Sequence, residues 1–226
     1  MAPPLAAGFL FTRAGRRIAA VIAALVAAVL LGIVMMLGSI AAMAATPGWS
    51  WGGSCSFDPA GVGSVTVTNA RDGEEVTLES GQLQNAATIL QIAQELGLPP
   101  TAGKIALMTG LQESKLKMLA NTGVPESLSF PHQGTGSDHD SLNVFQQRAF
   151  WGSVADRMDL DFAARAFFGG PSGPNQGSPA GLLDIEGWES MGLGEAAQAV
   201  QVSDFPDYYD GWAEAAEQVI LAVSGA

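Results

Sequence analysis

The fold is decided by residues 82–119, which read QLQNAATILQIAQELGLPPTAGKIALMTGLQESKLKML. In the first half of this stretch, apolar residues recur at the three- and four-residue steps of one helix face: Leu83, Ala86, Ala87, Leu90, Ala93 and Leu96. Gly97 and Pro99–Pro100 then interrupt the pattern, because glycine readily ends a helix and proline cannot continue one. The stretch predicts a helix from Gln82 to the residues before Gly97.

A second helix is expected directly after this break. Thr101 is a suitable N-cap, and the helix is expected to run through Lys104 to about Leu119. Its apolar residues available for burial are Ile105, Leu107, Met108, Leu111 and Leu116. Further helical patterns cover 159–168, 194–202 and 208–223, after a long polar loop at 120–142 and around a Gly/Pro/Ser-rich segment at 169–181. The predicted fold class is therefore mostly α, with one helical domain over residues 82–226.

Residues 46–81, which precede this domain, are expected to form a tether. From 46 to 64 the chain is rich in glycine and proline and has no periodicity, which is typical of a flexible linker. Val65–Thr68 and Val76–Leu78 alternate around a turn signal at Asp72–Gly73. This arrangement predicts a small β-hairpin within the tether.

The N-terminal part has the composition of a membrane anchor. No residue from Ile18 to Ala45 is charged, and this run exceeds the roughly 20 residues that a membrane crossing needs. Arg13, Arg16 and Arg17 precede it, and no basic residue follows before Arg71. The positive-inside bias therefore predicts residues 1–17 in the cytoplasm, a transmembrane segment at 18–45, and a cell-membrane protein with an extracellular C-terminal domain.

A long, cleaved signal peptide is the alternative reading of the same residues, because Ala42–Met43–Ala44 fits a small-x-small cleavage site. Both readings export the domain. Trp49 and Trp51 fall where aromatic residues anchor a membrane segment at the interface. Cys55 is the only cysteine, so an internal disulfide is excluded and the choice between an intermolecular disulfide and an unpaired linker thiol stays open.

The charge of the exported part excludes one class of partner. Beyond the apolar run there are seven basic and 22 acidic residues, a net charge of −15. A nucleic-acid-binding protein needs a basic stripe to neutralise phosphates, and this sequence has none. No nucleic acid is expected as a partner, and any glycan ligand would have to be recognised by shape and hydrogen bonds.

Glu113, near the end of the second predicted helix, is the candidate for chemistry. On the same helix face, one and two turns earlier, lie the small residues Thr109, Gly110 and Ala106. A carboxyl above such a strip has room beside it for a ligand, and partial desolvation would raise its pKa into the range of a general acid. Two other readings remain: the glutamate is simply solvated, or Gly110 marks close helix packing.

The run Leu111–Ser114 is followed after the loop by Asp140–Arg148, DSLNVFQQR. Together these runs resemble the lytic-transglycosylase and lysozyme-like superfamily, in which a helix ends in a Glu-Ser pair and a later Gly-Leu-Met-Gln-type turn closes a glycan cleft. The resemblance is closer to a variant in exported actinobacterial cell-wall and conjugation-type proteins, with Asp-Ser-Leu-Gly-Leu-Phe-Gln-Gln-Arg. Glu186–Met191 and Ala196–Tyr209 also resemble that variant, and the match covers about residues 83–215.

The resemblance implies a role for each matching residue. Glu113 takes the place of the catalytic acid, and Ser114 that of the residue supporting it. The implied substrate contacts are Phe145 as cleft wall, Gln146 as a sugar-contacting amide, Tyr208 or Tyr209 from the last helix, and Ser141 and Gln147 within the same motif. Asn143–Val144 departs from the family's Gly-Leu, but asparagine is the residue after glycine that best tolerates a positive φ.

The implied reaction cleaves the MurNAc–GlcNAc bond of peptidoglycan with a single carboxyl and gives a 1,6-anhydro sugar. Asp138 and Asp140 are possible second carboxylates, which a hydrolytic muramidase would place about 5–9 Å from the acid. The other reading, favoured especially for Asp140, is that they are turn formers. His132 and His139 beside them form only a thin case for metal binding, so no metal and no cofactor are expected.

The other aromatic residues divide between core and site. Trp188 and Trp212 are expected in the core, and Trp151, just after the motif, could stack on a sugar ring. The sequence thus predicts a membrane-anchored lytic transglycosylase that opens the wall locally, with secretion or conjugation proteins as possible partners. The alternative is a non-catalytic glycan-binding or scaffold domain of a cell-envelope machine.

Overall fold

A computed structural model of the protein describes residues 57, 61, 63–203 and 206–224. Within these residues the fold is mostly α, with six α-helices and two small sheets. No helix of this described part is long and apolar enough to cross a bilayer. The predicted anchor at 18–45, most of the tether, Trp49, Trp51 and Cys55 lie outside the described residues.

Helix α2 spans Ser80–Glu95 and confirms the first predicted helix. It begins two residues earlier than the pattern indicated, because the Gln82 side chain accepts a hydrogen bond from the Glu79 backbone N–H at 3.0 Å and so completes a capping box. All the apolar positions of the predicted stripe up to Ala93 are buried. Gly97, with a φ of 69°, turns the chain away after the helix.

Helix α3 spans Pro100–Ser114, so the predicted bounds of the second helix were wrong at both ends. Pro100 is the first helical residue and Pro99 the N-cap, which places Thr101 inside the helix; proline suits this position because its missing N–H would have no partner there. Lys115 and Leu116 adopt positive φ values of 56° and 63° and end the helix. Residues 119–121 consequently form a strand, and the helix does not continue to Leu119.

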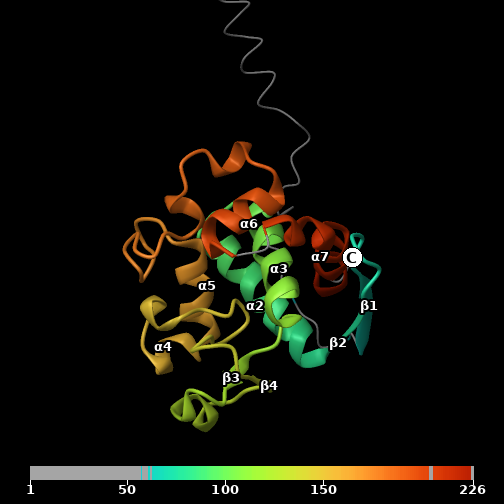
Figure 1. Ribbon diagram of the computed structural model, residues 1–226. Coiled ribbons are helices and arrows are strands. Elements are labelled where there is room, and N and C mark those ends of the chain that lie inside the picture. The colour runs from blue at the N-terminus through green and yellow to red at the C-terminus, as the bar shows by residue number, and fades with distance from the viewer. Residues whose placement is uncertain (1–56, 58–60, 62, 204–205, 225–226) are drawn as a thin grey trace, which may run out of the picture. The chain divides into compact units, whose positions relative to one another are not determined.

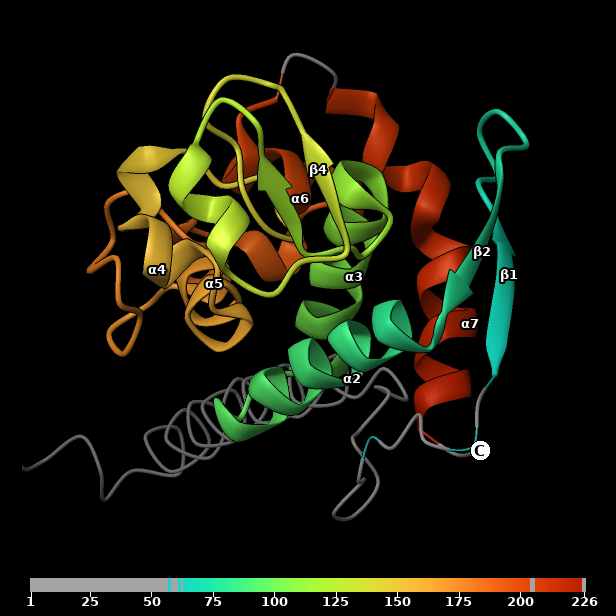
Figure 2. The same cartoon turned by 90° about the horizontal axis from the view of Figure 1, so that it is seen from below.

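The predicted hairpin is present, as strands β1 (Ser64–Thr68) and β2 (Glu75–Glu79), which pair antiparallel with Val67 opposite Val76. It belongs to the helical domain and not to the tether, because Val67 and Leu78 are buried in the same core as the helices. Figure 2 shows the hairpin lying alongside α7 (Ala213–Val223), with β2 leading directly into α2. The domain therefore begins before residue 82.

Helix α3 occupies the centre of the described part, with α2, α6 and α7 around it and α5 beside α2 (Figures 1 and 2). Helices α5 (Leu160–Phe168) and α6 (Leu193–Gln201) confirm two of the predicted helical stretches. The third is helical throughout but begins as a 3-10 helix, η7 (Pro206–Trp212), before α7. Trp188 and Trp212 are buried in the core, as predicted.

The polar loop at 120–142 contains regular structure and buried hydrogen bonds that the sequence did not indicate. Strands β3 (Leu119–Asn121) and β4 (Gly134–Gly136) pair parallel within it. The buried Asn121 side chain donates from Nδ2 to the carbonyl oxygens of Asp138 (3.0 Å) and Ser141 (3.1 Å), which fixes the end of the loop. The remaining short elements are α4 (Val154–Arg157), η3 (Pro125–Ser129), η4 (Ala149–Trp151), η5 (Leu182–Asp184) and η6 (Trp188–Ser190).

Candidate active site

Glu113 lies in the last turn of α3, half-buried, next to the left-handed residues that end the helix. Its Oε1 accepts a 2.7 Å hydrogen bond from the hydroxyl of Tyr209, which is only 1% exposed. Tyr209 belongs to η7, the 3-10 turn before the last helix. Two segments almost a hundred residues apart in the sequence therefore meet at the carboxyl group.

The surroundings of Glu113 favour its protonated form. Burial raises the pKa of its carboxyl above the model-compound value of 4.5, and the charge of Asp138 adds to this rise. The hydrogen bond from Tyr209 and the charge of Lys115 act in the opposite direction, yet the pKa stays raised. Burial also raises the pKa of Tyr209, so its hydroxyl stays protonated and remains a donor.

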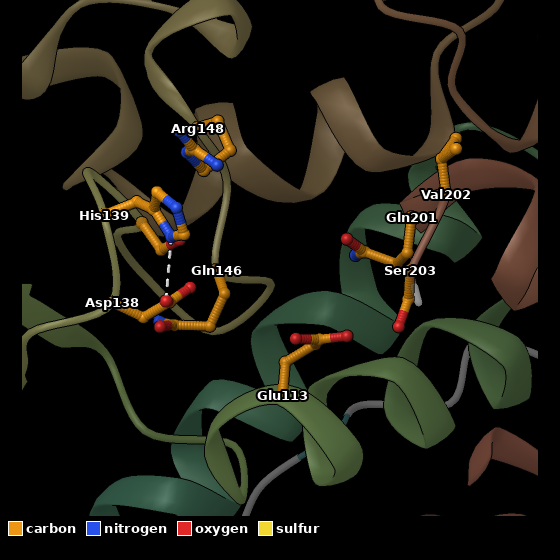
Figure 3. Close-up of a pocket in the computed structure, with 9 residues that line it drawn as sticks. Glu113, Asp138, His139, Gln146, Arg148, Gln201, Val202 and Ser203 are labelled. Carbon is orange, nitrogen blue, oxygen red and sulfur yellow. Dashed lines mark hydrogen bonds and ion pairs between the residues drawn. The ribbon is translucent and has the colours of Figure 1, made fainter. Parts of the chain in front are cut away.

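The carboxyl of Glu113 opens into a cavity of about 410 Å³. Figure 3 shows Glu113 at the floor, with Gln146, Arg148, Asp138 and His139 on one side and the end of α6 on the other. The lining residues are Glu113, Asp138, His139, Ser141, Gln146, Arg148, Gln201, Val202 and Ser203. Four of the predicted site residues, Glu113, Asp138, Ser141 and Gln146, therefore share one cavity that is open to solvent and mostly polar.

The turn at Asn143–Gln146 is built by the asparagine that departs from the family pattern. Asn143 has the positive φ of 65° that its position predicted, and its side chain is fully buried. Its Oδ1 accepts from the Phe145 N–H (2.8 Å), while its Nδ2 donates to Gln147 Oε1 and to the Arg157 carbonyl, both at 2.9 Å. The asparagine thus supplies three side-chain hydrogen bonds that glycine could not.

Ser114 connects this turn to the helix of the acid. Its buried hydroxyl donates to the Val144 carbonyl at 2.8 Å, while its implied support of Glu113 stays a prediction. Gly110 lets the turn approach, because a Cβ there would lie 2.7 Å from both Leu116 Cδ2 and Val144 Cγ1. The Ala106–Thr109–Gly110 strip is accordingly buried against protein and leaves no room for a ligand, contrary to expectation.

Two residues of the motif are structural and were wrongly predicted to contact substrate. Phe145 is fully buried and stacks on Phe167, with ring centroids 4.6 Å apart, so it is a core residue and not a cleft wall. Gln147 is buried too, and its Nε2 donates to the Ala163 carbonyl at 2.9 Å. Successive side chains alternate between the two sides of the turn. Phe145 and Gln147 therefore point toward the core, and Gln146 between them faces the cavity.

The two candidate aspartates differ in surroundings. Asp140 is a turn former, as favoured: its carboxylate binds Arg148 and accepts from the Ala149 N–H at 2.8 Å. Burial alone would raise its pKa, but these hydrogen bonds outweigh it and the pKa is lowered. Asp138 lines the cavity with its side chain 77% exposed and pairs with His139 at 2.9 Å.

The remaining predicted residues fall on or off the cavity. Ser141 lines it, whereas Tyr208 does not and lies beneath the Arg71 guanidinium, 4.3 Å from the ring centroid. His132 is exposed, with Nδ1 2.8 Å from the Phe130 carbonyl oxygen. Among the described residues no group of three or more histidine, cysteine or acidic side chains could hold a metal ion. Trp151 is largely buried and borders a smaller, neighbouring cavity.

Sequence reasoning assigned no role to the wall formed by the end of α6. Gln201, Val202 and Ser203 line the cavity opposite Gln146. Ser203 also makes a side-chain hydrogen bond to Tyr209. The Ala196–Tyr209 run contains these three residues, so its resemblance to the same variant is the sequence signal that could have identified this wall.

The arrangement defines a class of site: one desolvated, protonatable carboxyl, positioned by a neutral donor, at the floor of a polar cavity large enough for a sugar. A group of this kind suits proton transfer to a bound ligand. The chain matches no protein-family model, and no curated protein matches it. The function is therefore argued from the site itself.

Proposed function

We propose that this protein is a peptidoglycan-cleaving enzyme of the lytic-transglycosylase type, with Glu113 as its catalytic acid and a lysozyme-like fold. The observation that carries the proposal is the raised pKa of the Glu113 carboxyl at the floor of the 410 Å³ cavity, where Tyr209 holds it in one orientation. A general acid must be protonated near working pH and must reach the leaving oxygen. Burial shifts the pKa of Glu113 in the direction that the first condition requires, and the open side of the carboxyl supports the second.

The proposed reaction needs no second carboxylate. Glu113 donates its proton to the oxygen of the MurNAc–GlcNAc bond, the bond from this oxygen to the anomeric carbon breaks, and the substrate's own acetamido oxygen bonds to that carbon. The Glu113 carboxylate then removes the proton of the C6 hydroxyl, whose oxygen displaces the acetamido group. The product is a 1,6-anhydro sugar, water is neither consumed nor released, and the acid is regenerated.

The environments of the two aspartates support this choice over a two-carboxylate hydrolase. Asp140 is occupied by Arg148 and the Ala149 N–H, so its carboxylate is not available as a nucleophile. Asp138 is exposed and paired with His139, whereas a nucleophile in a retaining glycosidase is held firmly near the acid. Gln146 and Gln201 offer uncharged amides that can bind hydroxyl and acetamido groups.

The proposed setting is the outer face of the cell membrane. An anchor at residues 18–45 would keep the domain near the membrane, so that it cuts peptidoglycan locally at high effective concentration. Local opening of the wall suits a secretion or conjugation machine, whose proteins would be partners. The acidic composition of the exported part argues against a nucleic-acid ligand.

The test is digestion of purified peptidoglycan by the full-length protein in detergent. The released muropeptides are separated, and their masses are measured. We expect 1,6-anhydro products, which are lighter by one water than the hydrolysed ends, and we expect Glu113→Gln to abolish them. Glu75→Gln, a matched change at an exposed position of the hairpin, should leave the products unchanged. Hydrolysed ends would indicate a muramidase, and no products from the wild type would support the glycan-binding scaffold instead.

A further inference from the structure

A second cavity of about 170 Å³ adjoins the candidate active site. It shares four lining residues with the first cavity: Gln146, Arg148, Gln201 and Val202. The two spaces are therefore separated by a common rim, and a ligand bound over Glu113 can extend a branch across this rim. The second cavity begins where η4 and the end of α6 face each other.

The two cavities differ in chemistry. The six residues found only in the second have no charged or carboxamide side chain: Phe150, Trp151, Pro179, Ala180, Ala199 and Val200. The carboxamide and charged side chains are confined to the shared rim, where Gln146 and Gln201 carry amides and Arg148 a guanidinium. Among the residues that line the two cavities, Arg148 is the one cation with a permanent charge.

Two apolar side chains are left unusually exposed at this place. Phe150 is 68% exposed and Val202 is 80% exposed. Val202 also has a φ of 50°, which is a rare and strained conformation for a β-branched residue. Exposed aromatic surface and local backbone strain gather at binding sites more often than elsewhere.

We propose that the second cavity binds the peptide stem of the substrate, the chain attached through a lactyl ether to the muramoyl sugar next to the bond that is cut. This inference rests on the proposed function. A stem has backbone amides, small apolar side chains and carboxylates close to the sugar. The apolar floor accepts the first side chain, Gln146 and Gln201 pair with the amides, and Arg148, which also binds Asp140 through Nε, attracts a carboxylate in an otherwise acidic domain.

The lining favours a stem over another sugar ring of the strand. A ring presents several hydroxyl groups, and each needs a hydrogen-bond partner when it is buried. Beyond the rim the second cavity offers aromatic and aliphatic side chains, which suit a methyl-bearing peptide better. The stem would therefore be a determinant of specificity, with stem-bearing strands cleaved faster than stripped ones.

The experiment compares two substrates: glycan strands with their stems, and the same strands after an amidase has removed the stems. The full-length protein should cleave stem-bearing strands with a kcat/KM about tenfold higher, the discrimination expected from one well-buried small side chain. Phe150→Ala, which removes a wall, and Ala199→Leu, which fills the cavity, should each reduce this ratio toward one. Leu221→Ala and Ala155→Leu are matched controls at exposed positions away from both cavities, and they should preserve it.

A ratio near one in the wild type, or an equal loss on both substrates in Phe150→Ala and Ala199→Leu, would overturn the proposal. Its failure can be told from failure of the proposed function by a binding measurement on Glu113→Gln. N-acetylmuramoyl dipeptide should bind about tenfold more tightly than N-acetylmuramic acid, whether or not the wild type cleaves strands. Equal binding of the two probes would refute stem recognition by itself.

Discussion

Replacing Asn143 tests how the turn that presents Gln146 to the cavity is built. Asn143→Gly introduces the residue found in the pattern that this turn resembles, and it keeps the positive φ of 65° without strain. It also removes the three side-chain hydrogen bonds to Phe145, Gln147 and Arg157. The change therefore separates backbone tolerance from the bonds that the asparagine amide makes.

The expected loss can be worked from these contacts. Each bond contributes about 1 kcal/mol, and each partner left buried and unpaired costs as much or more, so the free energy of unfolding should fall by roughly 3 kcal/mol or more. Asn143→Ala loses the same bonds and adds about 1–2 kcal/mol of strain, because alanine disfavours the left-handed region. At about 2–4 °C per kcal/mol for a chain of this size, Asn143→Gly should lower Tm by roughly 6–12 °C, and Asn143→Ala by more.

Thermal unfolding followed by near-ultraviolet circular dichroism measures this loss through the buried Trp188 and Trp212. Gln176→Gly is the matched control, since Gln176 has a φ of 48° but is exposed; it relieves left-handed strain without breaking a buried hydrogen bond, so it should not lower the free energy of unfolding. A neutral or stabilising Asn143→Gly would refute the reasoning, because the asparagine would then serve only as a tolerated replacement for glycine. Equal losses in the glycine and alanine variants would refute the strain argument alone.

Three other substitutions probe the acid and its support. Tyr209→Phe removes a hydrogen bond that lowers the pKa of Glu113, so that pKa should rise further. The alkaline limb of a pH–rate profile should then move to higher pH, and kcat should fall about tenfold. A limb that does not move would contradict this reasoning. Glu113→Gln should raise Tm at neutral pH. Because folding raises the pKa of the Glu113 carboxyl, this group makes the protein less stable as the pH climbs from 4.5 through the folded-state pKa. The difference in Tm between the variant and the wild type should vanish near pH 3. Gly110→Ala should destabilise the fold by about 1 kcal/mol net, since the contacts of the new Cβ at 2.7 Å outweigh the gain in helix propensity. Urea unfolding measures this change, and a more stable variant would contradict the prediction.

Periodicity predicted the elements that bury one continuous face. The stripe from Leu83 to Ala93 defined α2, and similar patterns defined α5 and α6, because these helices lie against the core with polar residues outward. The same reasoning failed for α3. This helix is surrounded by others and has little amphipathic contrast, so Leu116 and Leu119 continued the apolar count after the backbone had already turned at Lys115.

The sequence predicted the position of a site residue only where that position depends on the residues next to it in the chain. Glu113 followed by Ser114 places a carboxyl at a helix end, and that much is local. Whether Phe145, Gln146 or Gln147 faces the cavity depends on the turn, which is fixed by Asn143 and by Gly110 on another element. Sequence spacing cannot supply that orientation, and so two of these three residues were assigned to the wrong side.

The hairpin completes the site from a distance. Tyr209 can orient Glu113 only while η7 is fixed, and three elements hold it there. Trp212 Nε1 donates to Gln112 on α3 at 2.7 Å, the Gly194 N–H of α6 donates to Asp210 at 2.9 Å, and the Ala70 N–H of the hairpin loop donates to the Gly211 carbonyl at 2.8 Å.

The contact between hairpin and η7 is close enough to demand glycine, because a Cβ on Gly211 would overlap the Asn69 side chain. Arg71 adds a bond from Nη1 to the Asp207 carbonyl and covers the ring of Tyr208. The strands that follow the tether in sequence are thus part of the structure that positions the acid. A domain cut at residue 82 would keep Glu113 and Gln146 but lose one of the three supports of Tyr209, so a protein made to test the proposed activity has to include the hairpin.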